Sequence, residues 1–278
     1  MLLFQSLIMK NKSSSHNKLI DKIILGSASL AVLLCVIALQ IPRLNSIGAT
    51  SSYLTSQQLN QESEALRRKL QITQDFPAFG FDNIVVNWYF LNFLQYFGDS
   101  NSRQRTGYQV SPEFFKNIIP RDPYFFFGYL FLSTSTSLYA AQPQVTVGLI
   151  TEGLTYLNPT LPPEAPIIWR YKGVDELLFL GRPEDAIQSY QTAAEWADQS
   201  PYPDIRATGD LSRRTAAFIT ENPDSDRTLV MGWSQILGQA VDETTFNLAV
   251  EQIEALGGEV IRQPDGQFTI RMPNNLDK

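Results

Sequence analysis

The chain has 278 residues and a formal net charge of −6, and 44% of its residues are hydrophobic, which is enough to build a folded core. Residues 1–43 hold five of the 22 basic and one of the 28 acidic side chains, so residues 44–278 carry 17 basic and 27 acidic groups, a net charge of −10. An acidic body repels phosphate backbones, which excludes nucleic acid as an expected partner.

The only histidine, His16, and the only cysteine, Cys35, both precede residue 43. The rest of the chain therefore has no side chain for a Ser-His-Asp or Cys-His site, nor for a zinc site that uses His or Cys. The sequence also contains no GxxxxGK[ST] or GxGxxG loop for phosphate binding. We expect no catalytic residue, no metal site and no cofactor.

Residues 23–41, IILGSASLAVLLCVIALQI, contain no charged side chain. As a helix they span roughly 28 Å, close to the thickness of a bilayer's hydrocarbon core. Four lysines precede this run and Arg43 follows it, a bias that places the N-terminus in the cytoplasm. The pattern predicts a single-pass membrane protein with a basic tail at 1–22, a transmembrane helix at 23–41 and an extracytoplasmic body.

Two alternatives to the anchor remain open. A cleaved signal peptide has an apolar stretch of about 7–15 residues and a small-residue cleavage site. Here the stretch is longer, and the best cleavage site, Ile47-Gly48-Ala49, lacks the small residue at its first position. A buried helix of a soluble protein is the second alternative. For an anchored chain, the membrane is the cell membrane or, by analogy, a photosynthetic membrane, with the body in the periplasm or lumen.

A linker and a first helix follow the anchor over residues 42–81. Residues 42–55 are polar, and Ser56 begins a predicted helix that runs to residue 72 as a stalk or a first packing helix. The next helix, 82–97, is apolar nearly all round, with Asp82 as its cap. Such a helix is typical of a core, and a face toward the membrane or a partner is the alternative.

Proline, glycine and capping residues then divide the chain into short helices and one hairpin. Strands at 259–262 and 267–271 flank a Pro-Asp-Gly turn and predict a β-hairpin. The predicted fold is all-α, with a helical body at 82–238 and a cap of helix and hairpin at 239–278. The further helices are expected at 112–119, 124–139, 143–158, 164–180, 183–197, 204–221, 225–238 and 242–256.

Several of these helices are followed by the same type of residue pair, an Asp or Asn before a Pro. Asp122-Pro123 and Asn158-Pro159 are 36 residues apart, and Asn222-Pro223 follows 64 residues later, which equals two units of about 32 residues. Periods in the thirties that are made of paired helices indicate a helical-hairpin solenoid.

Residues 169–197 resemble a tetratricopeptide (TPR) unit. Gly181 occupies the turn between the two helices, and Ala186, Tyr190 and Ala193 occupy the small, large and small positions of the second helix. Gly173 stands one residue from its expected place, and an earlier unit has Val147 where the family has alanine. The segment 88–99 is similar to bacterial membrane-anchored TPR-like proteins. This resemblance implies a scaffold and names no ligand.

The aromatic run from Tyr124 to Leu132 is the densest unusual feature of the sequence. Core packing explains such a run, and a groove for a partner is the alternative, because a solenoid offers a concave surface. The candidate partner-binding residues are Tyr124 and Phe127, with Arg121, Arg170 and Lys172 as a basic rim for an acidic partner segment.

The sequence favours a membrane-tethered TPR-like scaffold that mediates protein–protein interaction and helps to assemble or retain a membrane complex. The alternative is a carboxylate-based cell-wall glycosidase on a helical scaffold. Its closest acid pairs, such as Asp175-Glu176, are adjacent in sequence, and adjacent side chains on a helix point about 100° apart. A third possibility is a homo-oligomer built through the edge of the C-terminal hairpin.

Overall fold

The computed structural model of the chain describes residues 34–36, 38, 54–223, 225–240, 242–262 and 268–273. The chain divides into two compact units, Met1–Thr55 and Ser56–Lys278. The basic tail at 1–22, nearly all of the predicted transmembrane helix at 23–41 and most of the linker at 42–55 lie outside the described residues. Among the residues that are described, no helix has both the length and the apolar character needed to cross a bilayer.

The second unit is mostly helical with one small sheet, as expected. Its two strands, β1 (Glu259–Arg262) and β2 (Phe268–Arg271), pair antiparallel and set Arg262 opposite Phe268. Its helices are α2 Ser56–Thr73, α3 Asp82–Gly98, α4 Ser100–Thr106, α5 Ser111–Ile118, α6 Phe126–Leu132, η1 Ser133–Tyr139, α7 Pro143–Leu154, α8 Ala165–Leu178, α9 Pro183–Asp198, α10 Pro203–Glu221, α11 Asp226–Gln239 and α12 Glu243–Ala255.

Local chemistry sets most of these helix boundaries. Five helices have proline in their first turn, where a missing N–H costs no hydrogen bond: α5, α7, α8, α9 and α10. Asp99, Ser225 and Asp242 accept backbone N–H groups at the starts of α4, α11 and α12. The sequence therefore predicts these ends to within a residue or two, except for α4, which it did not indicate.

The helix predicted over 124–139 is present from Phe126 to Tyr139, but it changes type within that range. α6 covers its first half, and the second half, η1, is a π-helix in which the Ala140 N–H donates to the Ser135 carbonyl at 3.2 Å. Residues 133–137 are all Ser or Thr, whose hydroxyls compete for backbone acceptors; the Ser135 hydroxyl donates to the Phe131 carbonyl at 2.8 Å. π-Helical turns occur frequently at functional sites.

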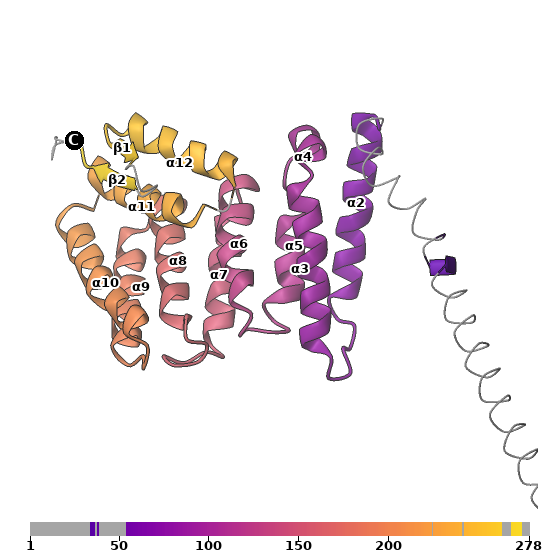
Figure 1. Cartoon of the computed structure of the whole chain (residues 1–278), viewed down its shortest axis with the longest axis horizontal. Coiled ribbons are helices and arrows are strands. Elements are labelled where there is room, and N and C mark those ends of the chain that lie inside the picture. Colours follow the sequence, from indigo (N-terminus) through magenta and orange to yellow (C-terminus); the bar gives the residue numbers. More distant parts are fainter. Residues whose placement is uncertain are drawn as a thin grey trace, which may run out of the picture. The chain divides into compact units, whose positions relative to one another are not determined.

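From α2 to α10, successive long segments of the second unit point in opposite directions, and α12 lies across one end of them (Figure 1). The chain therefore turns alternately at two ends of the helices. We call one end the apolar edge; it holds the connections 74–81, 119–125, 155–164 and 199–202. The opposite end, which we call the polar edge, holds the connections 99–110, 140–142 and 179–182. The helix α12 and the β-hairpin lie near the polar edge (Figure 1).

Two apolar clusters form the core of this unit. The first joins α2, α3 and α5 to α8, and its centre is Phe93, whose ring lies 4.7 Å from Phe115 between ring centroids. The second joins α8 to α12 around the fully buried Tyr190. Leu70 of α2 belongs to the first cluster, so this helix packs with the others as part of the unit that begins at Ser56.

The residues that carry the TPR resemblance lie where α8 meets α9. Gly181 has φ +61° in the turn between them, a backbone conformation that favours glycine. Ala186, Tyr190 and Ala193 are completely buried. A Cβ atom on Gly173 would lie 3.0 Å from Cε2 of Tyr190, so the small residue makes room for the aromatic ring.

Candidate functional site

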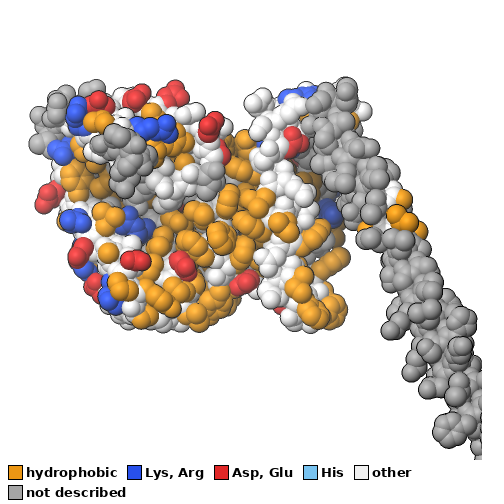
Figure 2. Space-filling model, in the orientation of Figure 1, with side chains coloured by type: hydrophobic (Ala, Val, Ile, Leu, Met, Phe, Trp, Pro, Cys, Tyr) orange, Lys and Arg blue, Asp and Glu red, His pale blue; other side chains and the backbone are white. Residues whose placement is uncertain are grey.

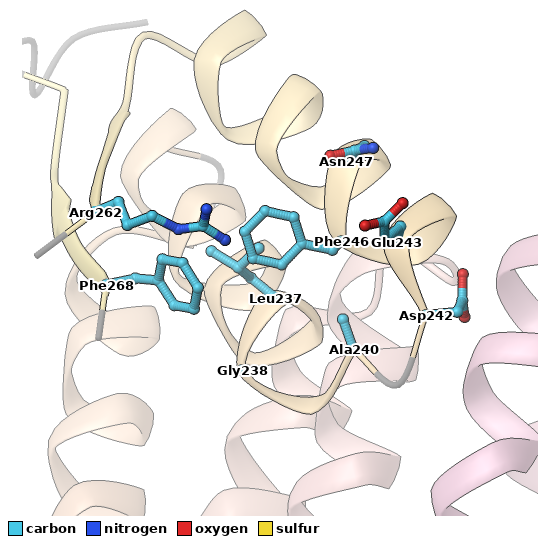
Figure 3. A pocket seen from close by; sticks show the side chains of 9 residues that line it. All are labelled: Leu237, Gly238, Ala240, Asp242, Glu243, Phe246, Asn247, Arg262 and Phe268. Carbon is cyan, nitrogen blue, oxygen red and sulfur yellow. The ribbon is translucent and has the colours of Figure 1, made fainter. Parts of the chain in front are cut away.

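An open pocket of about 710 Å³ lies between α11, α12 and the β-hairpin (Figure 3). Its walls combine apolar, cationic and acidic side chains from segments that are separate in the sequence. It is lined by Leu237, Gly238, Ala240, Asp242, Glu243, Phe246, Asn247, Arg262 and Phe268.

An arginine and two phenylalanines form one wall of this pocket. The rings of Phe246 and Phe268 have centroids 5.1 Å apart, and Cζ of Arg262 lies 5.9 Å and 5.5 Å from those two centroids (Figure 3). Cross-strand pairing brings Arg262 beside Phe268, and α12 supplies Phe246. Within the described residues, Arg262 has no carboxylate within salt-bridge distance. A stacked guanidinium of this kind keeps its charge available to an anionic group.

The opposite end of the pocket holds two carboxylates at the start of α12. Asp242 caps the helix, because its side chain accepts the Thr245 N–H at 2.8 Å and the Thr245 hydroxyl at 2.7 Å. Glu243 is exposed in the first helical turn, where the helix dipole favours an acid. The pocket thus has an apolar floor between a cationic and an acidic end.

Of the candidate residues from the sequence, Arg121 lies at the apolar edge and binds the α2–α3 connection. Its Nη2 donates to the carbonyls of Thr73, Gln74 and Phe76 at 3.1, 2.7 and 2.7 Å. Its Nη1 lies 3.7 Å from a carboxylate oxygen of Asp82. These backbone contacts occupy the guanidinium with the chain's own loop.

We expect Arg121→Ala to lower the free energy of unfolding by about 1–2 kcal/mol, since three hydrogen bonds from a charged donor are lost, one of them partly buried and two exposed. Chemical denaturation of the full chain measures this, and limited proteolysis should cut within 74–81 faster than in the parent. Arg121→Lys is the matched control, since it keeps the charge near Asp82 and loses the three-carbonyl geometry. Unchanged stability and cutting in the alanine variant would contradict this role.

Arg170 and Lys172 lie among the packed helices α8 to α11. Arg170 is only 8% exposed and donates to Ser212 Oγ at 2.8 Å and to Gln235 Oε1 at 2.9 Å. Its burial lowers the pKa of the guanidinium from the usual value. Lys172 forms an ion pair with Glu176 and donates to Ser189 Oγ at 3.1 Å. Both cations therefore make contacts within the helical unit.

Tyr124 and Phe127 are exposed at the apolar edge. The Tyr124 hydroxyl donates to the Tyr156 carbonyl at 3.0 Å and so joins two connections of that edge. The structure brings Arg121, Tyr124 and Phe127 to one end of the helices and places Arg170 and Lys172 between α8 and α11, so the five candidates do not form one rim.

The structure also buries an acid, Asp175, that the sequence indicated only as half of an adjacent acid pair. Asp175 of α8 is completely buried, and this burial raises the pKa of its carboxyl to about 7. The hydroxyls of Ser133 and Ser137 in η1 counteract part of the increase. Among the described residues, no hydrogen bond of standard geometry reaches either carboxylate oxygen. The signal in the sequence was an acid in line with the apolar Ile168 and Tyr171 of the same helix.

Comparisons with protein-family models, with curated proteins and with solved structures find no match to this chain. Within the described residues, no group of three or more His, Cys, Asp or Glu side chains is placed to hold a metal ion.

Proposed function

We propose that this chain is a membrane-tethered, TPR-like scaffold that binds a segment of a protein partner in the pocket between α11, α12 and the β-hairpin. The observation that carries the proposal is the guanidinium of Arg262 against the rings of Phe246 and Phe268, in the wall of an open recess lined by both apolar and polar side chains. Aromatic residues and arginine are the side chains that dominate binding energy at protein interfaces. The occupant is an apolar side chain next to a carboxylate that pairs with Arg262.

The scaffold part of the proposal is supported by antiparallel helix pairs and by the TPR-like packing of Gly181, Ala186, Tyr190 and Ala193 between α8 and α9. The tether is residues 23–41, with the N-terminus in the cytoplasm and the helical unit in the periplasm or lumen. Confinement at the bilayer raises the effective concentration of this unit toward membrane-bound partners. Assembly or retention of a membrane complex follows as its role.

We favour the scaffold over a carboxylate-based glycosidase because of where the acids lie. Such an enzyme needs two carboxyl groups about 5–10 Å apart in a cleft. Asp175 has the raised pKa of a general acid, but it is completely buried and does not line the pocket. Asp242 lines the pocket and accepts two hydrogen bonds as a helix cap.

Site-specific photocrosslinking in membranes tests the proposed function. A photoreactive residue at Asn247, which lines the pocket, should capture a discrete partner, whereas one at the exposed Gln144 of α7 should not. Once the partner is identified, Arg262→Glu should weaken its binding about tenfold or more, because the variant sets a like charge against the partner's acid.

Arg214→Glu is the matched control, since it reverses an exposed arginine on α10 away from the pocket. Phe246→Ala should weaken binding by a similar factor through loss of the aromatic wall. Equal affinities for the parent and the Arg262→Glu variant would contradict the pocket as the binding site.

A further inference from the structure

Exposed aromatic side chains gather at one end of the helices. Each of the four connections of the apolar edge carries at least one: Phe76, Phe79 and Phe81 in the first, then Tyr124, Tyr156 and Tyr202 in the other three. Orange side chains accordingly lie along the lower margin of Figure 2, below the ends of α2 and α3 and near α7 and α8. Ile84 and Phe127, in the first turns of α3 and α6, extend the same edge.

The polar edge differs in composition. Within the described part of its three connections, no large hydrophobic side chain is exposed, and the side chains there include Arg105 and Arg182. Because consecutive helices are antiparallel, alternate connections fall at the same end. A sequence in which only alternate connections carry exposed aromatics therefore builds one apolar end and one polar end.

The α2–α3 connection is the most apolar part of the edge, and its geometry is held firmly. Phe79 is 85% exposed and has φ +50°, and Gly80 follows with φ +85°. A bulky side chain is unfavourable in left-handed backbone, so the surrounding structure must impose this conformation. The Phe81 N–H donates to the Ala78 carbonyl at 2.8 Å across this turn, and Arg121 holds the start of the connection through its hydrogen bonds to three carbonyls there. The fold thus retains strain and exposes a large aromatic side chain.

The chemistry of the edge suits a lipid interface. Tyr and Trp are enriched at the boundary between headgroups and acyl chains, and Phe is one of the apolar side chains that peripheral helices bury there. The exposed rings stand on four separate connections, which suits a broad surface more than a single peptide. The charged residues in and next to the connections of the apolar edge include Asp75, Asp82 and Asp122. Electrostatic attraction to anionic lipid therefore does not explain binding of this edge to a bilayer.

The linker between the proposed anchor and α2, residues 42–55, is long enough to allow this contact. α2 has 18 residues and is about 27 Å long, and it begins at the end opposite the apolar edge. Residues 42–55, if fully extended, reach up to roughly 46 Å. A linker of that reach lets a helix that ends at residue 41 share a bilayer with the apolar edge.

We propose that the apolar edge docks on the lipid bilayer that holds the anchor, with its aromatic side chains in the interfacial layer. The inference rests on the proposed tether and is independent of the pocket. Since α12 and the hairpin lie near the polar edge, docking turns the pocket away from the lipid and toward the aqueous phase, where a partner's extramembrane segment can reach it.

Lipid-contact quenching in vesicles tests this. The full chain with Cys35→Ser is reconstituted in zwitterionic phosphatidylcholine, and a fluorescent label is attached at Phe79→Cys or, as the control on the polar edge, at Arg182→Cys. Lipids brominated on the acyl chain should quench the label at 79 and leave the label at 182 bright. High salt should not change the result, because the contact is apolar.

A second variant shows whether the edge docks as a unit. Replacing Phe76 and Phe81 together with Ser should abolish the quenching of a label at Tyr156→Cys on another connection. Leu211→Ser removes an exposed apolar side chain from the middle of α10, away from the apolar edge, and should leave that quenching intact. Circular dichroism confirms that both variants fold.

Three results would overturn the inference. The first is an unquenched label at residue 79 in a chain that stays on the membrane during a carbonate wash. This result would agree with the tether and contradict docking of the apolar edge. The second is equal quenching at 79 and 182. The third is contact between labels at 79 of two copies without lipid quenching, which assigns the edge to self-association. Release of the chain by carbonate contradicts the tether itself, and with it both proposals.

Discussion

Gly153→Ala should lower the free energy of unfolding by about 3 kcal/mol, the largest loss expected from adding a single methyl group to this chain. A Cβ atom at Gly153 would lie 2.0 Å from the hydroxyl oxygen of Tyr129 and 2.8 Å from its Cζ. Tyr129 is completely buried, and its hydroxyl donates to the Pro123 carbonyl at 2.9 Å, so the ring cannot withdraw without breaking that bond. Denaturation by urea, followed by circular dichroism, measures the change.

The control lies in the same helix. A Cβ atom at Gly148 of α7 meets nothing within 4 Å, so Gly148→Ala should stabilise the chain by about 0.5–1 kcal/mol through helix propensity. Tyr129→Phe removes the closest atom and should restore part of the stability lost in Gly153→Ala. If the two glycine variants had the same stability, the close packing of α6 against α7 would be contradicted.

Asp175→Asn should stabilise the folded chain at pH 8 by up to about 4 kcal/mol and change its stability little at pH 4. The pKa of the Asp175 carboxyl is about 7 in the folded state, against 3.8 for an aspartate free in water. Between pH 3.8 and about pH 7 the folded state holds a proton that the unfolded state has released. The free energy of unfolding therefore falls as the pH rises through this range. Above pH 7 the folded state must keep an ionised, buried carboxylate that forms no ion pair with any described residue.

The measurement is the free energy of unfolding of the parent and the variant at several pH values from 4 to 8. Asparagine has nearly the same shape as aspartate and cannot ionise, so the difference between the curves isolates this one group. Glu184→Gln is the control for the loss of an exposed carboxyl on the neighbouring helix α9. Parallel curves for the parent and Asp175→Asn would show that the buried carboxyl does not titrate in this range.

Asp175 also shows how two unusual features of the fold belong together. It faces η1, the π-helical segment whose Ser133 and Ser137 hydroxyls lower its pKa against the effect of burial. A π-helical turn rotates the following side chains relative to an α-helix, which places these hydroxyls differently from a regular continuation of α6. The hydroxyls of the serine-rich segment therefore offset part of the cost of ionising the buried acid, and no exposed surface is needed to explain either feature.

The sequence by itself predicted where most of the helices begin, because proline in a first turn and a capping Asp or Ser act through the backbone within a few residues. It predicted the β-hairpin for the same reason, and the resemblance of residues 169–197 to a TPR unit pointed to the buried alanines and tyrosine of α9. It did not indicate α4 or the π-helical form of η1, and α7 ends four residues before the expected position.

Tertiary structure alone decided the rest. Spacing cannot show whether a cation such as Arg121, Arg170 or Lys172 faces solvent or an internal acceptor, because the acceptor belongs to another segment. The pocket joins residues 237 to 268 through a strand pairing. The apolar edge exists because antiparallel packing brings alternate connections to one end, a relation between helices that no local pattern contains.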